Sequence, residues 1–156
     1  MRLRVPRVYI DTSVVGGCLD TEFQRYSERL RADFAEGRLR AVLSDVTIAE
    51  LRRAPAAIQA QLARPGFAEA ERVNIDEEAD SLADDYIRSG VVPESSRADA
   101  EHIAIATVHG VDVLVSWNFK HIVKLSRIRA FNAVNLRLGY PSLEIRSPLE
   151  VYHEEN

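Results

Sequence analysis

The sequence contains very little cysteine. Its 156 residues include only Cys18, so a disulfide within the chain is excluded. The cysteine and histidine spacings match no structural zinc site either. Small secreted domains commonly depend on disulfides, whereas thiols stay reduced in the cytoplasm. We therefore expect a cytoplasmic protein.

Long apolar runs are also missing. No stretch approaches the roughly 20 apolar residues that span a bilayer. The N-terminus has no apolar segment followed by a small-residue cleavage site, as a secretory signal would. These absences predict that the chain is neither inserted in a membrane nor secreted.

Glycine and proline are scarce, with seven and six residues, and no low-complexity tract is present. The composition is 46% hydrophobic and 28% charged, which is typical of a globular protein. A chain of this length can bury a substantial apolar core without outside help. We expect one domain over residues 1–156.

Acidic residues are absent from one long stretch. Between Val113 and Leu143 there is no Asp or Glu, although the whole chain carries a net charge of −4. Affinity for a nucleic-acid backbone comes mainly from Lys and Arg, so this stretch is a candidate phosphate-binding surface. Surface ion pairs are an equally good interpretation for any one of its basic residues. These are Lys120, Lys124, Arg127, Arg129 and Arg137.

The apolar pattern predicts strands that alternate with helices. Strands are expected at 8–10, 41–44, 73–75, 111–115 and 143–146. A turn at Gly16 and Gly17 is expected to precede a helix that runs from about Leu19 to Gly37. Further helices are expected from 47, at 55–64, 76–89 and 96–109, and between 116 and 138. This alternation predicts an α/β sandwich with a mainly parallel sheet.

Four polar residues lie where parallel sheets bind their ligands. Asp11 follows the first apolar strand, and Asn118 follows the strand that ends in VLVSW. Glu50 opens the helix after the second strand, and Asp99 lies near the start of the helix before VLVSW. Parallel strands open their carboxyl ends at one edge, so we expect these side chains to lie together.

Three carboxylates in one cleft need a counter-charge. Their mutual repulsion is on the order of 4 kcal/mol per close pair at intermediate dielectric. A divalent cation removes it, and an all-oxygen set of ligands favours Mg²⁺ or Mn²⁺. Taken singly, each residue has a simpler interpretation as a helix cap, with Thr47 to Glu50 and Ser96 to Asp99 as capping boxes.

The order of these motifs resembles that of PIN domains, and in particular of VapC toxins. The matching segments are VYIDTSVVGG, DVTIAEL, DAEHIAIA and VLVSWNFKH, and the resemblance covers nearly the whole chain. It implies a PIN-like three-layer sandwich with a five-stranded sheet in the order 3-2-1-4-5. It also implies a metal-dependent ribonuclease that acts on RNA, forms a homodimer and is silenced by a small antitoxin.

The resemblance assigns the site residue by residue. It implies Asp11, Glu50 and Asp99 as catalytic metal ligands. At the fourth acidic position this chain has Asn118, preceded by Ser116, where PIN domains usually have Asp in a T-x-D pattern. We include Ser116 and Asn118 among the catalytic residues, and Asn118 among the metal ligands. Asn keeps an oxygen but loses the charge, which weakens the prediction of a second metal.

Neighbouring residues have competing interpretations. His102 could support Asp99, although a buried histidine with satisfied hydrogen bonds is the simpler reading. Trp117 could stack on a base, although core packing is more common beside a strand end. Lys120, Lys124, Arg127 and Arg129 could hold the RNA backbone.

Three other functions compete with this one for the whole chain. A receiver-type domain lacks the Lys it needs after the last strand, and a haloacid-dehalogenase-type phosphatase would need Asp where Ser13 stands. The main alternative is a PIN-fold module that binds RNA or protein with weakened catalysis.

Overall fold

The computed structural model describes residues 4–153 and contains a five-stranded sheet in which every neighbouring pair of strands is parallel. The order is β3-β2-β1-β4-β5, as predicted from the resemblance. The two ends of the predicted domain, residues 1–3 and 154–156, lie outside the described residues. The strands are β1 (Arg7–Ile10), β2 (Arg40–Ser44), β3 (Glu71–Val73), β4 (Val113–Val115) and β5 (Ile145–Arg146).

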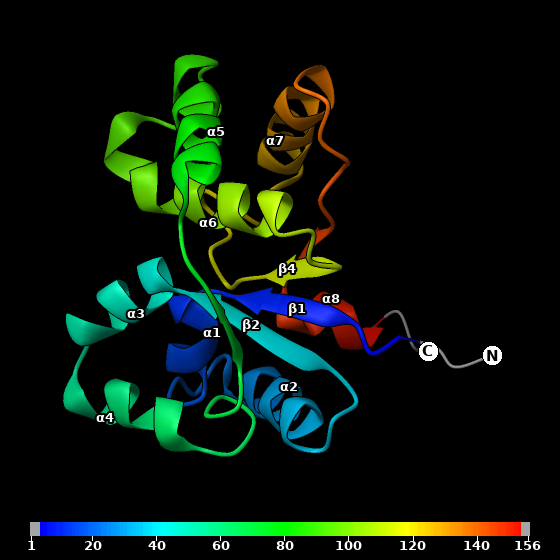
Figure 1. Cartoon of the computed structure of the whole chain (residues 1–156). Helices are drawn as coiled ribbons and strands as arrows, with labels where there is room; N and C mark the ends of the chain where they lie inside the picture. Colours follow the sequence, from blue (N-terminus) through cyan, green and yellow to red (C-terminus); the bar gives the residue numbers. More distant parts are fainter. Residues whose placement is uncertain (1–3, 154–156) are drawn as a thin grey trace.

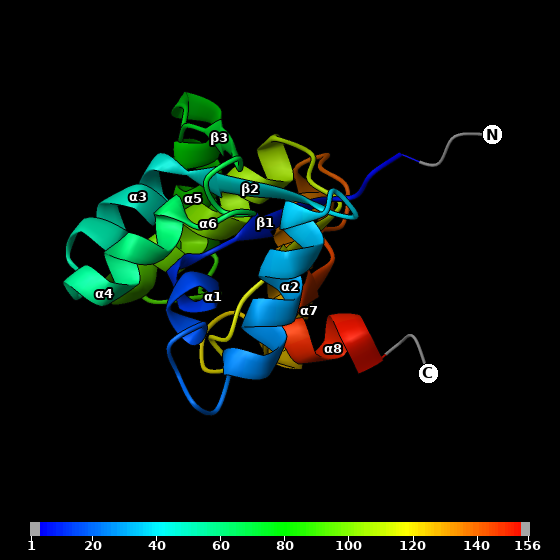
Figure 2. The ribbon, with the colours of Figure 1, turned by 90° about the horizontal axis from the view of Figure 1, so that it is seen from below.

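Helices cover both faces of the sheet and make the predicted sandwich (Figure 1). One face carries α5 (Glu77–Arg88), α6 (Arg97–Val108) and α7 (Leu125–Arg137). The other carries α1 (Thr12–Gly17), α2 (Gln24–Ala35) and α8 (Pro148–His153), and Figure 2 shows this face with α2 beside α8. Among residues 4–153, no helix is both long and apolar enough to cross a membrane.

The remaining helices extend beyond the carboxyl ends of the strands. They are α3 (Asp45–Arg52) and α4 (Ala56–Gln59), followed by the 3-10 turn η1 (Ala60–Ala63). A second 3-10 turn, η2 (Glu94–Ser96), leads directly into α6. The helices α3 and α6 contact each other, so the start of α6 lies beside the edge where β1 and β2 end.

The alternation of side chains along β1 divides the core in two. Tyr9 belongs to the cluster under α5, α6 and α7. Val8 and Ile10 belong to the opposite cluster under α1, α2 and α8. Successive strand residues point to opposite faces, so one strand anchors both layers.

The chain after β1 differs from the prediction. Gly16 and Gly17 were expected in a turn, but they are the last two residues of α1. The helix expected from Leu19 begins only at Gln24, and Leu19 itself is exposed. The predicted start of this helix is therefore wrong, and lies more than one turn too far toward the N-terminus. Helix α8 was not predicted at all.

Helix caps also differ from those expected. Thr47 is not the N-cap of α3: Ser44 is, and its hydroxyl accepts from the backbone of Thr47. Glu50 consequently lies in the second half of α3 and makes no capping bond. Ser96 occupies the N-cap position of α6 but its side chain makes no capping hydrogen bond. The capping interpretations of Glu50 and Asp99 are both wrong.

Candidate active site

Asp11 lies at the point where β1 passes into α1. It is the N-cap of α1, and its Oδ1 accepts from the backbone N–H and the hydroxyl of Ser13, at 3.1 and 2.6 Å. Its Oδ2 accepts from the hydroxyl of Ser116 at 2.6 Å. Only 5% of Asp11 is exposed. The capping interpretation is therefore correct for this residue, and it leaves the carboxylate facing the end of β4.

Hydrogen bonds join the ends of β1 and β4. The backbone N–H of Trp117 donates to the hydroxyl of Ser13, and that of Asn118 donates to the hydroxyl of Ser116. The predicted site residue Ser116 thus fixes Asp11 and the turn after β4 together. Trp117 is buried, stacks on Phe23 and donates its indole N–H to Ser27. Trp117 is a core residue, as the simpler interpretation held.

Asp99, in the first turn of α6, contacts Asn118. The amide Nδ2 of Asn118 donates to Asp99 Oδ1 at 3.3 Å. The Oδ1 of Asn118 accepts from the backbone N–H of His121 at 2.9 Å. A backbone N–H can only donate, so this contact fixes which end of the amide faces Asp99. Asn118 acts toward Asp99 as a donor.

Glu50 is held by a histidine from the opposite helix. His102 Nε2 bonds to Glu50 Oε1, and His102 Nδ1 lies 2.7 Å from the hydroxyl of Tyr9. That hydroxyl is also 2.7 Å from the hydroxyl of Ser44, the N-cap of α3. His102 is only 1% exposed. The prediction of a buried histidine with satisfied hydrogen bonds is confirmed, and its carboxylate partner is Glu50 rather than Asp99.

The three acids influence one another electrostatically. Burial raises the pKa of Asp11 above its ordinary value, and the charge of Glu50 adds to this effect. Burial likewise raises the pKa of Asp99, with further contributions from Asp11 and Glu50. Burial opposes a charge on His102, but Tyr9 and Glu50 raise its pKa well above the ordinary value. The site is thus an acidic cluster with one internal counter-charge.

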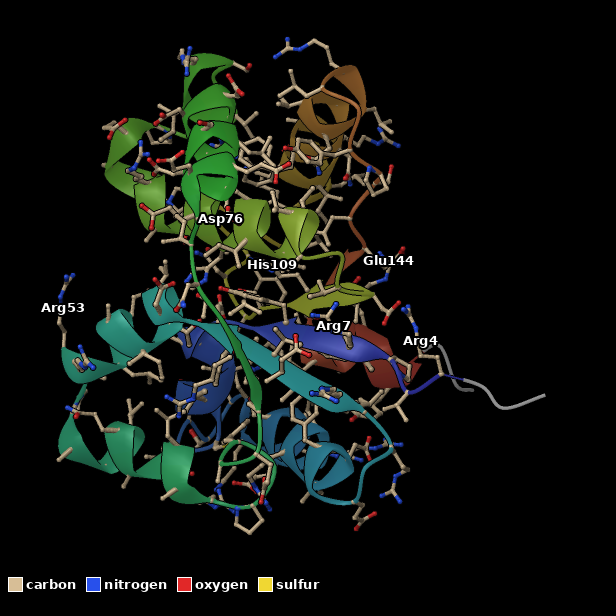
Figure 3. The ribbon with its side chains drawn as sticks, viewed as in Figure 1. Arg4, Arg7, Arg53, Asp76, His109 and Glu144 are labelled. Carbon is tan, nitrogen blue, oxygen red and sulfur yellow. The ribbon has the colours of Figure 1, made fainter. Side chains whose placement is uncertain are left out.

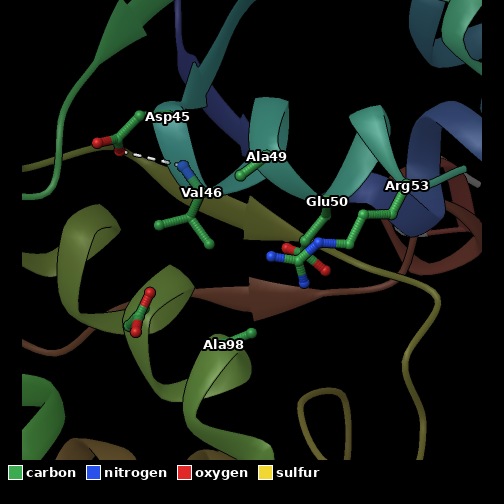
Figure 4. A pocket seen from close by; sticks show the side chains of 7 residues that line it. Asp45, Val46, Ala49, Glu50, Arg53 and Ala98 are labelled. Atoms are coloured by element: carbon green, nitrogen blue, oxygen red, sulfur yellow. Dashed lines mark hydrogen bonds between the residues drawn. The ribbon is translucent and has the colours of Figure 1, made fainter.

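Two cavities flank the cluster. One of about 360 Å³ lies between α3 and α6, and Glu50 and Arg53 both project into it (Figure 4). The other, of about 500 Å³, is lined by Thr12, Gly16, Phe23 and Asn118 among others. The first is lined by Glu50 and the second by Asn118, so each cavity borders one predicted site residue.

Three exposed basic side chains near the carboxyl edge of the sheet lack ion pairs within residues 4–153. Arg53 projects at the edge where the strands end, whereas Arg4, Arg7 and Glu144 lie at the opposite edge (Figure 3). Lys120 and Lys124 are exposed in and after the turn that follows β4. Arg53, Lys120 and Lys124, unlike Arg4 and Arg7, form no ion pair within residues 4–153.

The residues fit a hard divalent cation in donor type and charge. Asp11, Glu50 and Asp99 supply carboxylate oxygens, each able to accept more bonds than it makes here. The raised pKa values of Asp11 and Asp99 show that extra positive charge would be favourable there. Within residues 4–153, however, no group of three or more Asp, Glu, His or Cys side chains is arranged so that it could hold a metal ion. Metal binding would require these side chains to move closer together.

Several residues of the site were not predicted. Tyr9 and Ser44 looked like ordinary strand residues, and only the register of β1 and β2 brings their hydroxyls together. Ser13 follows Asp11 by two residues, and an Asp directly after a strand is itself a capping signal. His121 carried no signal of its own, because it contacts Asn118 through its backbone N–H, which any residue other than Pro would supply.

Comparisons of sequence gave no match. No model of a known protein family matches this chain, and no curated protein is similar to it in sequence.

Comparison of structures gave several similar folds. A chain of VapBC2 from Rickettsia felis, solved bound to a DNA fragment from its promoter, is 13% identical with a TM-score of 0.58 and covers 90% of this chain and 98% of its own. VapC20 of Mycobacterium tuberculosis, a toxin that cleaves the sarcin-ricin loop, is 16% identical with a TM-score of 0.55, over 88% and 98%. FitAcB from Neisseria gonorrhoeae is 18% identical with a TM-score of 0.57, over 91% and 98%. At these identities the likeness is one of fold, and the chain has the PIN-domain fold of the VapC-type toxins.

Proposed function

We propose that this chain is a metal-dependent endoribonuclease that hydrolyses RNA phosphodiester bonds. The observation that carries the proposal is the acidic cluster of Asp11, Glu50 and Asp99, which three separate elements bring to the carboxyl edge of a PIN-domain sheet. Glu50 contributes to the raised pKa of Asp11, and both Asp11 and Glu50 contribute to that of Asp99, so their negative charges lie close enough to repel one another.

Asp11, Glu50 and Asp99 would hold Mg²⁺ or Mn²⁺. When bound, such an ion activates water and offsets the charge that develops on the phosphate oxygens. The chain's own residues orient the reactants. Ser13 and Ser116 fix the carboxylate of Asp11, and His102 fixes that of Glu50.

Charge next to the cluster supports RNA as the substrate. Lys120 and Lys124, in and after the turn that follows β4, and Arg53, after α3, lack ion pairs within residues 4–153, so their charges are available to phosphates. We also propose that the chain acts on RNA in the cytoplasm.

We also propose that the chain is the toxin of a type II toxin–antitoxin pair, forms a homodimer and binds a small antitoxin. The support is the fold shared with VapC20, a toxin, and with VapBC2 and FitAcB. Co-expression with the protein encoded immediately upstream, followed by co-purification, tests the partner. Light scattering tests the dimer.

The experiment that tests the nuclease is Asp11→Asn. Asn keeps the size and can still bond Ser13 and Ser116, so the fold should persist while metal-dependent RNA cleavage is lost. Asp85→Asn on the outer side of α5 is the control and should cleave like wild type. Wild-type cleavage by a folded Asp11→Asn protein would refute the proposal.

The alternative is a PIN-fold binding module with weakened catalysis, which the donor role of Asn118 favours. The effect of Mn²⁺ on the free energy of unfolding distinguishes the nuclease from the binding module. A protein that binds the ion is stabilised by RT ln(1 + [L]/Kd), which is about 1.4 kcal/mol at ten times Kd. A module that binds no metal shows no such gain, and this result would support the alternative.

A further inference from the structure

The larger of the two cavities beside the acidic cluster differs from its neighbour in what lines it. Charged side chains, among them Glu50, Arg53 and Glu101, line the cavity between α3 and α6. The cavity of about 500 Å³ is lined mainly by glycine, alanine, isoleucine and aromatic residues. Its volume lies within the range of about 300–1,000 Å³ that is typical of small-ligand sites. It is therefore suited to a flat and largely apolar group.

Three aromatic rings meet at this cavity. Phe23 and Trp117 both line it, and their rings stack with centroids 4.3 Å apart. Phe119 lies beside both, with its ring centroid 6.4 Å from that of Phe23 and 6.1 Å from that of Trp117. Trp117 is buried, but Phe23 is only half-buried and Phe119 is 47% exposed. Residues 4–153 thus leave part of this aromatic surface uncovered.

The wall of the cavity is joined by hydrogen bonds to two of the three acids. Ser13 lines the cavity and donates to Asp11 Oδ1 at 2.6 Å. Asn118 also lines it and donates to Asp99 Oδ1 at 3.3 Å. The cavity is therefore continuous with the proposed active site, and a nucleotide next to the acids has it as its neighbour.

We propose that this cavity receives one unpaired base of the RNA, next to the phosphodiester bond that is cleaved, and that the base stacks on Phe23. This inference rests on the proposed nuclease and adds the class of substrate, which is RNA that is single-stranded at the cleaved bond. Bases in a duplex are stacked and paired, whereas an unpaired base can turn out onto an aromatic side chain. Exposed Lys120 follows Phe119 in the chain, so positive charge for the RNA backbone lies beside the aromatic surface.

RNA without bases tests the cavity separately from the charges around it. Two oligonucleotides of equal length and charge are compared in EDTA, one a single strand of mixed sequence and the other abasic throughout. Trp117 is the only tryptophan of the chain and lines the cavity, so its fluorescence reports on the site. RNA with bases should quench this fluorescence and bind at least about fivefold more tightly, which is the lower end of what one stacked base contributes. Abasic RNA should bind through its phosphates without quenching.

Substitution of Phe23 tests the stacking surface. Phe23→Leu keeps an apolar side chain but removes the ring, so RNA with bases should lose its advantage over abasic RNA. Phe23→Tyr should restore that advantage. The matched control is Phe34→Leu, the same change near the other end of α2, where the ring packs against Phe67. Phe34→Leu should keep the wild-type preference, and thermal unfolding identifies the variants that are folded.

The outcomes separate the two proposals. Equal affinity and equal quenching for RNA with and without bases would overturn the inference, and so would a preference for bases that persists in folded Phe23→Leu. The proposed nuclease stands in either case if cleavage depends on metal and on Asp11. Quenching of Trp117 by the protein encoded upstream, but not by RNA, would assign the cavity to a protein partner and would equally overturn the inference. A wild type that neither binds nor cleaves RNA would refute both.

Discussion

The hydroxyl of Tyr9 connects two buried groups, the hydroxyl of Ser44 and Nδ1 of His102. It lies 2.7 Å from both Ser44 Oγ and His102 Nδ1. Through them it links β1 to the cap of α3 and to the histidine that holds Glu50. One hydroxyl thus supports both the fold and the orientation of a proposed ligand.

Tyr9→Phe is expected to reduce the free energy of unfolding by about 1–3 kcal/mol, because a buried partner is removed while the ring remains. Urea denaturation measures this loss. Tyr140→Phe is the control, since its hydroxyl bonds an exposed glutamate and should matter much less. Equal stability of Tyr9→Phe and wild type would contradict a continuous network.

At the residue scale the sequence indicated the acids but not their partners. Asp11 follows an apolar strand, and Asp99 precedes another, so sheet topology alone brings them together. Which atoms contact each carboxylate depends on side-chain direction. Tyr9 reaches His102 only because its side chain faces α6 rather than α1. The sequence of β1 is apolar on both faces of the sheet, so it does not show which helix layer Tyr9 faces.

Among the elements, α1 shows where sequence patterns were insufficient. A Gly-Gly pair predicts a turn, because glycine costs stability in a helix. Packing explains one of these glycines. At position 17, α1 lies too close to α2 and Trp117 for any larger residue. Helices α5 and α6 were predicted to within one residue at each end because their patterns extend over 12 residues, whereas α1 has only six.

The two glycines of α1 are expected to respond in opposite ways to alanine. A Cβ at position 17 would lie 2.4 Å from Ser27 Oγ and 2.8 Å from Trp117 Nε1, which would disrupt their hydrogen bond. Gly17→Ala should therefore cost about 1–3 kcal/mol. At position 16 the nearest atom is 3.7 Å away, on Ile58, so Gly16→Ala should be neutral or stabilise by up to about 1 kcal/mol. Thermal unfolding of the two variants measures both effects. A Gly17→Ala protein as stable as wild type would contradict the close packing.

Helix α2 is joined to the segment before β3 by an ion-pair group. Glu28 bonds Arg64 and Arg31. The hydrogen bond from Arg64 is the main cause that holds the pKa of Glu28 below its ordinary value. A carboxylate with a lowered folded-state pKa contributes stability above its unfolded pKa and loses it as pH falls through the folded value.

Glu28→Gln should therefore lower stability at pH 7 and have a much smaller effect in the acid range below pH about 4. Urea denaturation at both pH values measures the difference. Glu22→Gln, an exposed residue before α2, is the control. A stability loss of equal size at both pH values would show that charge is not the cause.

At the scale of the whole molecule, charge is distributed unevenly around the sheet. Acidic residues of α5 are partly neutralised by Arg97, which pairs with Asp80 and Asp84. Lys120 and Lys124 have no such partners within residues 4–153. The net negative charge of the chain therefore does not prevent one local surface from attracting phosphates.

Replacing Lys120 and Lys124 together by Glu should weaken RNA binding and reduce the slope of log K against log salt by roughly 1.4 for single-stranded RNA. Metal affinity should not change. Arg88→Glu with Arg137→Glu, at the outer ends of α5 and α7, is the matched control of equal charge. If the slope stays the same in the Lys120 and Lys124 variant, RNA binds elsewhere.

The central position of β1 has a consequence for synthesis of the protein. This strand is made first, yet Ser116, which bonds Asp11, comes 105 residues later. Until β4 pairs with β1, Asp11 lacks its bond to Ser116, and the turn that carries Asn118 is not joined to the end of β1. A growing chain on the ribosome thus lacks an assembled acidic cluster until most of it has been translated. On the proposed function, incomplete copies are harmless to the RNA around them.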